Sequence, residues 1–225
     1  MLQKGKFKAV LFDLIGTLVN TTDPSEIFRR ILDAYGVRVS VKNTSEAYRK
    51  NEKDFGVKEM VQSGSSFGLS GTKMLETLGV QRGTESLPRK TDELWWNYAD
   101  IRVYPDVIET LPHLKSKGVR TGVVTNGYEK DFQLVLQRLA LTDHFDIVVE
   151  IDSCNSAKPD SKIFLHAVSK LHVQPEEALY VGDSFQYDFE GAKAAGLKPL
   201  LVNRNERTTR KAGTINSLTE VLTYI

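Results

Sequence analysis

The chain has little of several features that would each have indicated a special class of protein. It has one cysteine, Cys154, among 225 residues, so no disulfide can form within it. A single cysteine fits a reducing compartment. No stretch approaches the roughly 20 apolar residues of a membrane helix. The basic start MLQKGKFKAVLF meets Asp13 before any signal-peptide cleavage site. We therefore expect a cytoplasmic protein that contacts no membrane.

An excess of charge of one sign is also lacking. The 30 lysines and arginines nearly match the 29 aspartates and glutamates, which leaves a net charge of +1. This balance does not favour nucleic acid as a partner, because the phosphate backbone is recognised through excess positive charge. Internal repeats and low-complexity tracts are absent too. The composition, 40% hydrophobic and 26% charged, is that of an ordinary globular protein.

Short apolar runs alternate with helix-like segments through most of the chain. The first run, Ala9 to Phe12, ends on Asp13 and is followed by a Gly16-Thr17 turn. Strands of this kind that alternate with helices predict a parallel sheet covered on both faces, an α/β fold. The further predicted strands are 120–125, 145–150, 178–183 and 199–202. The predicted helices of this part are 107–117, 129–139, 161–171, 188–195 and 217–224.

The segment from residue 21 to residue 100 differs from the rest because it lacks clear strand runs. Three stretches have helical spacing, 24–35, 44–54 and 91–100, and a Gly/Ser-rich loop at 63–71 lies between them. We predict a helical insertion after the first strand. Such an insertion is expected to lie over the carboxyl ends of the strands and to act as a lid.

Polar residues follow four of the predicted strands. They are Asp13, then Thr125-Asn126-Gly127, then Lys158 in the loop after the third strand, and Asp183 with Asp188 after the fourth. Because the carboxyl ends of parallel strands meet at one edge of the sheet, we expect these groups to converge. Neighbouring carboxylates repel one another unless a cation is present, and oxygen-only ligands favour Mg²⁺. Lys158 and Thr125 would then suit a phosphoryl group.

The segments FDLIGTLV, VVTNG, AKPDSKIF and YVGDSFQYDFEGAKAAG resemble the four motifs of the haloacid dehalogenase superfamily of hydrolases. They occur in the family's order and cover the sheet domain nearly end to end. The resemblance implies a Rossmann-like, three-layer core from residues 1–20 and 101–225, with a helical cap from residues 21–100. It does not fix the reaction, because function depends on the site rather than on the fold.

The resemblance also implies roles for single residues. Asp13 resembles the nucleophile, Thr125 the hydroxyl that binds a phosphoryl oxygen, and Lys158 the cation that steadies both. Asp183 resembles a direct Mg²⁺ ligand, and Asp188 a second acidic residue near the metal or near Lys158. The other predicted metal ligands are Asp13 and the backbone carbonyl of Ile15, and the other predicted substrate contacts are Thr17, Asn126 and Gly127. For Thr17 and Asn126, a structural role in the turn or loop is an open alternative.

Ile15 is a departure from the family pattern. Phosphatases of this family usually carry a second Asp two residues after the nucleophile, where it acts as general acid and base, and Ile15 cannot move a proton. General acid–base catalysis is typically worth about 10²–10⁴ in rate. Either another group supplies the proton, the leaving group needs none, or the reaction is not ordinary phosphomonoester hydrolysis. For a phosphohydrolase, we expect acyl and aryl phosphates, which have good leaving groups, to be cleaved better than alkyl phosphates.

Three functions stay open at this point. The first is a Mg²⁺-dependent phosphohydrolase that forms an aspartyl-phosphate on Asp13 from a small phosphorylated metabolite. The second is a metal-independent 2-haloacid dehalogenase, favoured by the missing second Asp and by the Asn126-Gly127 pair. The third is a catalytically weak family member that binds phosphate or a partner. Asp183 and Asp188 favour the first, because two acidic residues in this motif serve a cation.

Overall fold

The structure, a computed structural model, describes residues 7–54, 59, 61–62, 64, 68–80, 86–204 and 213–225. The chain divides into two compact units, one of Met1–Asn20 with Arg102–Ile225 and one of Thr21–Ile101. Among the described residues, no helix has both the length and the apolar character that a membrane crossing requires.

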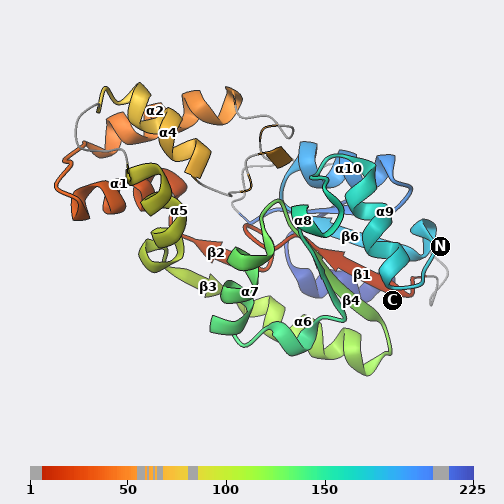
Figure 1. The fold of residues 1–225 in the computed structure, drawn as a ribbon. Helices are drawn as coiled ribbons and strands as arrows, with labels where there is room; N and C mark the ends of the chain where they lie inside the picture. Colours follow the sequence, from red (N-terminus) through yellow and green to blue (C-terminus); the bar gives the residue numbers. More distant parts are fainter. Residues whose placement is uncertain are drawn as a thin grey trace. The chain divides into compact units, whose positions relative to one another are not determined.

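A six-stranded parallel sheet forms the centre of the first unit (Figure 1). In spatial order its strands are β5 (Ile147–Val149), β4 (Arg120–Val124), β1 (Ala9–Phe12), β6 (Ala178–Gly182), β7 (Lys198–Val202) and β8 (Thr214–Ile215). β1 pairs in parallel with both β4 and β6, and all four of its residues are fully buried. This is the environment that a continuous apolar run favours. Asp13 therefore follows an inner strand of the sheet.

Helices cover both faces of this sheet (Figure 1). On one face, α9 (Ser161–Lys170) and α10 (Gly191–Ala194) pack in one hydrophobic cluster with alternate residues of β1 and β6, such as Leu11 and Tyr180. On the other face, α6 (Pro105–Ser116) packs with a 3₁₀ helix at Leu218–Tyr224. The predicted α/β class, a parallel sheet between helical layers, is confirmed.

The remaining helical elements of this unit are mostly short. They are α7 (Glu129–Arg138), α8 (Ile151–Cys154), 3₁₀ turns at Thr142–His144 and Pro175–Glu177, and a π-helix at Phe185–Glu190. The π-helix begins three residues before the helix predicted at 188–195. Its start is set by Ser184, whose side chain accepts a hydrogen bond from the Tyr187 N–H at 3.2 Å.

Three short strands were not predicted from the sequence. They are β8, β2 (Val19–Thr21) and β3 (Ile101–Val103), and the last two pair with each other. Each has only two or three residues, too few for a period-two pattern to be recognised. β2 and β3 lie where the chain leaves the first unit and returns to it.

The second unit contains four described helices, α1 (Pro24–Ala34), α2 (Val41–Asp54), α4 (Gly68–Thr77) and α5 (Leu87–Tyr98). α1 begins at Asp23, whose carboxylate accepts the Ser25 N–H at 2.9 Å, with Pro24 in the first turn. The predicted loop at 63–71 is partly wrong, because α4 already begins at Gly68. Apart from residue 64, the earlier part of that loop lies outside the described residues.

Candidate active site

Asp13 continues the register of β1 beyond its last residue. Its backbone N–H donates to the Val181 carbonyl at 2.9 Å, so the ladder with β6 extends to this position. Because side chains alternate along a strand, Asp13 projects on the same face as Leu11. The Asp13 side chain is therefore buried at the carboxyl edge of the sheet, with 6% of the residue exposed.

Lys158 links Asp13 to Asp188. Its ammonium lies 2.6 Å from Asp13 Oδ1 and 2.7 Å from Asp188 Oδ1, and all three residues are buried. Asn126 holds the lysine backbone in place, because its Oδ1 accepts the Lys158 N–H at 2.7 Å and its Nδ2 donates to the Lys158 carbonyl at 2.9 Å. Asn126 thus has a loop-shaping role, and its contact with substrate stays a prediction.

Tyr180 also reaches this ion pair, and sequence reasoning missed it. Its hydroxyl lies 3.2 Å from Lys158 Nζ and 3.0 Å from Asp188 Oδ1. The available signal was a single tyrosine within the otherwise apolar strand ALYVG. We call Asp13, Lys158, Tyr180 and Asp188 the lysine cluster.

The electrostatics of the lysine cluster are unbalanced. Burial is the largest cause that raises the pKa of Asp13, and the charges of Asp188 and Asp183 act in the same direction. Together they outweigh the opposing effect of Lys158, and the pKa is raised to about 7. Burial by itself would lower the pKa of Lys158, but Asp13 and Asp188 outweigh this effect and the pKa is raised. The ammonium therefore stays charged, and the neighbouring carboxylates still exceed it in number.

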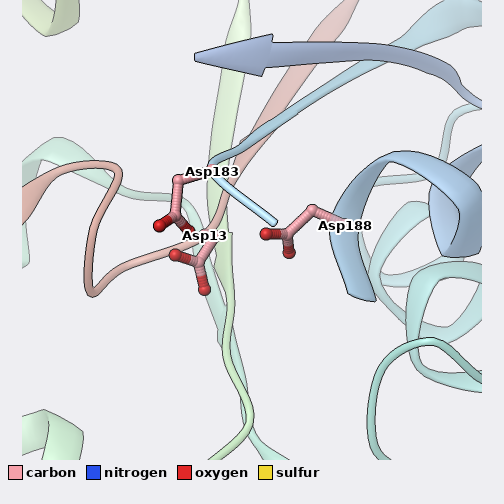
Figure 2. Close-up of side chains that lie close together, drawn as sticks. All are labelled: Asp13, Asp183 and Asp188. Carbon is pink, nitrogen blue, oxygen red and sulfur yellow. The ribbon is translucent and has the colours of Figure 1, made fainter. Parts of the chain in front are cut away.

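Asp183 adds a third carboxyl group beside the lysine cluster. One oxygen each of Asp13, Asp183 and Asp188 can be chosen so that all lie within 4.8 Å of one another. Figure 2 shows the three carboxyl groups close together. Asp183 is exposed, yet the surrounding protein removes enough water to raise its pKa. The charge of Asp188 acts in the same direction, and the pKa is raised to about 6. The site thus concentrates negative charge at one point.

The donor set fits a hard divalent cation. All three side chains offer oxygen, and Asp13 Oδ2 is buried with no hydrogen-bond partner among the described residues. In contrast, both oxygens of Asp188 are engaged, Oδ1 by Lys158 and Tyr180 and Oδ2 by the Ser184 N–H at 2.9 Å. This geometry favours Asp188 as the partner of the lysine, with Asp13 and Asp183 as the carboxylates open to a cation.

Two glycines allow the carboxyl groups to approach this closely. Gly16 has a φ of +87°, and a Cβ there would collide with the Asp183 carboxyl group. A Cβ at Gly182 would collide with the carboxyl group of Asp188. Ile15 precedes Gly16 in a turn closed by the Gly16 N–H and the Val19 carbonyl at 2.8 Å. Metal binding by the Ile15 carbonyl stays a prediction.

The same turn is held by Arg204, which sequence reasoning also missed. Its Nη2 and Nε donate to the Thr17 carbonyl at 2.6 and 3.2 Å, and its Nη1 lies 2.7 Å from Asp106 Oδ2. The guanidinium also covers the ring of Tyr104, 4.0 Å from its centroid. Arg204 follows β7 at the carboxyl edge, which was the one sequence signal for it. We call Arg204, Asp106 and Thr17 the arginine cluster.

The remaining predicted residues lie at the ends of β4 and β1. Thr125 is buried just after β4, and its N–H donates to the Val149 carbonyl at 3.0 Å. Gly127 packs so closely on the Phe132 ring that a Cβ would overlap it. Thr17 is fully buried, and its hydroxyl has no hydrogen-bond partner within the described part of the chain. Substrate contacts by Thr125, Gly127 and Thr17 stay predictions.

The sequence is similar to one family model and to curated proteins of that family. The family model for haloacid dehalogenase-like hydrolases matches residues 7–196. A glyceraldehyde 3-phosphate phosphatase of Methanopyrus kandleri is 38% identical over 109 residues, which are 48% of this chain and 47% of that protein. (S)-2-Haloacid dehalogenase 1 of a Pseudomonas species is 30% identical over 130 residues, 58% of this chain and 55% of that protein. The chain thus spans about half the length of the curated relatives that it matches.

A solved structure matches nearly the whole chain. It is that of a HAD phosphatase from Thermococcus onnurineus, with 27% identity and a TM-score of 0.65. The match covers 96% of this chain and 97% of that one. The likeness therefore includes both units of the chain.

Proposed function

Because the chain belongs to the haloacid dehalogenase-like hydrolases, we propose that it is a Mg²⁺-dependent phosphohydrolase that uses Asp13 as its nucleophile. One observation carries this proposal. Two carboxylates contact the Lys158 ammonium, the Asp183 carboxyl group lies beside them, and Asp13 Oδ2 is buried without a hydrogen-bond partner among the described residues. A carboxylate oxygen in this state is available both to a cation and to an electrophile. A phosphatase among the relatives supports the same reaction class.

Residues that would hold the metal are present. Asp13 and Asp183 would bind Mg²⁺ directly, with the Ile15 carbonyl as a backbone ligand and Asp188 beside them. A bound Mg²⁺ would offset the negative charge of a phosphoryl group and of the carboxylates. The pKa values of Asp13 and Asp183, raised to about 7 and about 6, fit this proposal because a nearby cation would favour their charged forms.

The chain's own residues would carry out the transfer in two displacements. Asp13 Oδ2 attacks phosphorus, and the bond from phosphorus to the leaving oxygen breaks with its electron pair on that oxygen. Lys158 holds Asp13 Oδ1, and the Thr125 hydroxyl binds a phosphoryl oxygen. Water then attacks phosphorus, and the bond to Asp13 breaks, which releases phosphate and restores the carboxylate.

Ile15 limits the first displacement. No proton can come from this side chain, so the leaving oxygen departs without a general acid at this position. We infer that acyl and aryl phosphates are the better substrates. We also propose that the helical unit, Thr21–Ile101, acts as the cap that selects the substrate.

Phosphate release tests the reaction. We would assay acetyl phosphate, p-nitrophenyl phosphate and glycerol 3-phosphate in Mg²⁺ and in EDTA. We expect turnover that needs Mg²⁺, that is fastest with acetyl phosphate, and that is abolished by Asp13→Asn. The exposed Asp143→Asn serves as a matched control that keeps activity. Turnover that persists in EDTA or in Asp13→Asn would contradict the proposal.

A 2-haloacid dehalogenase is the second candidate. Ile15 favours it, because halide needs no proton on departure, and a relative bears this activity in its name. Asp13 Oδ2 would then displace halide at carbon, and water would hydrolyse the resulting ester. The exposed charge of Asp183 is unexplained in this case. Halide release from 2-chloropropionate in EDTA, with no phosphate release from any substrate, would select this candidate.

A further inference from the structure

The sheet places Tyr180 so that its hydroxyl reaches Lys158, the lysine that contacts the reacting carboxylate of Asp13. It lies on β6 opposite Leu11 of β1, so its ring projects on the face from which Asp13 also projects. The residue is fully buried. Its hydroxyl lies 3.2 Å from Lys158 Nζ, 3.0 Å from Asp188 Oδ1 and 3.2 Å from the Val124 carbonyl.

The hydrogen atoms of this cluster can be accounted for. The Lys158 ammonium has three N–H donors, and two of them point to Asp13 and Asp188. The third has the Tyr180 oxygen as its partner. The single proton of that hydroxyl then goes to Asp188 Oδ1 or to the Val124 carbonyl. The Lys158 and Tyr180 donors thereby all have partners, which matters because an unsatisfied buried donor is costly.

We propose that Tyr180 is a positioning residue, which keeps the Lys158 ammonium directed at Asp13 throughout the reaction. This inference rests on the proposed function. When Asp13 carries a phosphoryl group, its carboxylate becomes an acyl phosphate and Oδ1 loses most of its negative charge. The lysine stem is flexible and its ammonium can rotate. Asp188 and Tyr180 are then the fixed partners that hold the ammonium where the second displacement needs it.

The ring and the hydroxyl of Tyr180 can be tested separately. The ring packs edge-on against Phe164 of α9, with centroids 4.9 Å apart and planes at 78°. Phenylalanine at this position would keep that packing and the volume of the side chain. Tyr180→Phe therefore removes the contact with Lys158 and leaves the core filled.

The experiment compares Tyr180→Phe with wild type and with Tyr224→Phe, a control at the end of the chain. For Mg²⁺-dependent hydrolysis of acetyl phosphate we expect kcat to fall about tenfold or more in Tyr180→Phe, because an interaction worth about 1.4 kcal/mol corresponds to a factor of ten. We expect KM to change less than about threefold, since a residue that acts through Lys158 mainly affects the reacting state. A purely structural role would lower stability and leave kcat of the folded protein unchanged.

Beryllofluoride binding gives a second readout that needs no turnover. This anion forms a phosphoryl-like adduct on a carboxylate, and calorimetry in Mg²⁺ should show about tenfold weaker binding to Tyr180→Phe. Equal kcat and equal binding in the two proteins would overturn the inference. An inactive wild type would refute the proposed function separately. In that case beryllofluoride binding tests the role of Tyr180 by itself. Weaker binding to Tyr180→Phe would support the positioning role, and equal or absent binding in both proteins would overturn it.

Discussion

Two cationic side chains of the core, Lys158 and Arg204, lie at the carboxyl edge of the sheet, and their surroundings differ. In the lysine cluster, one ammonium contacts two buried carboxylates, and a third carboxylate, Asp183, lies beside them. In the arginine cluster, one guanidinium contacts one carboxylate, Asp106, and its other bonds go to the uncharged Thr17 carbonyl. Negative charge is therefore in excess in the lysine cluster, whereas positive and negative charge are balanced in the arginine cluster.

The pKa values follow this difference. Burial pushes the pKa of Asp106 upward, but Arg204, the Leu218 N–H and the Ser217 hydroxyl outweigh it, and the pKa is lowered. For Asp13, burial is the largest effect and the pKa is raised to about 7. A balanced ion pair stabilises its surroundings, whereas a cluster with excess negative charge can still bind a further cation.

The largest expected effect comes from removing the ammonium. Lys158→Met leaves Asp13 and Asp188 buried without a cation, and losing one partner of a buried pair typically destabilises by about 3–5 kcal/mol. We also expect kcat to fall by about 10²–10³, the usual effect of losing one electrostatic stabiliser. Urea unfolding and acetyl phosphate hydrolysis would measure both. Lys162→Met, on the exposed side of α9, is the control. Wild-type activity in Lys158→Met would contradict the role of the lysine cluster.

The two clusters should respond to pH in opposite directions. The pKa of Asp13 is about 7 in the folded protein and near its ordinary 3.8 when unfolded, so the folded state binds more protons between these values. In EDTA, stability should therefore fall as the pH rises from about 4 through 7, by roughly 1.4 kcal/mol per pKa unit as an upper bound. The lowered pKa of Asp106 acts the other way, since its contribution is lost as the pH falls below about 4.

Thermal unfolding in EDTA between pH 5 and 8 measures the Asp13 contribution. Asp13→Asn should flatten the decline, and Mg²⁺ at pH 7.5 should restore stability to the wild type. A pH profile that is the same in wild type and Asp13→Asn would show that the excess charge of the lysine cluster has no energetic consequence.

The smallest effects are expected from the arginine cluster. Arg204→Met loses charge-assisted hydrogen bonds to Asp106 and Thr17, and we expect a loss of about 1.5–3 kcal/mol in unfolding free energy. Ser217→Ala removes one bond to Asp106 and the side-chain cap of the 3₁₀ helix at Leu218–Tyr224, and should cost about 1–2 kcal/mol. In both variants, kcat for acetyl phosphate should fall less than in Lys158→Met. A loss of activity in Arg204→Met equal to that in Lys158→Met would remove the distinction between the clusters.

Much of the core follows from the sequence because its signals are local. The apolar runs at Ala9 to Phe12 and at 178–182 each form a fully buried strand, and parallel pairing of β1 with β6 brings Asp13 and Asp183 to one edge. The short strands β2, β3 and β8 could not be predicted, because two or three residues carry no period. The start of α4 at Gly68 could not be predicted, because the glycine and serine residues around it favour loops.

The sequence by itself determined the fold class and the meeting of Asp13, Lys158 and Asp183, since parallel strands bring all their carboxyl ends to one edge. Only the tertiary structure decided which partner each charge takes. Lys158 and Tyr180 are 22 residues apart, and Thr17 and Arg204 are 187 apart, yet both pairs are hydrogen-bonded. Such pairings depend on packing between distant segments, because a side chain's partner is set by the geometry of the folded sheet and not by its neighbours in the chain.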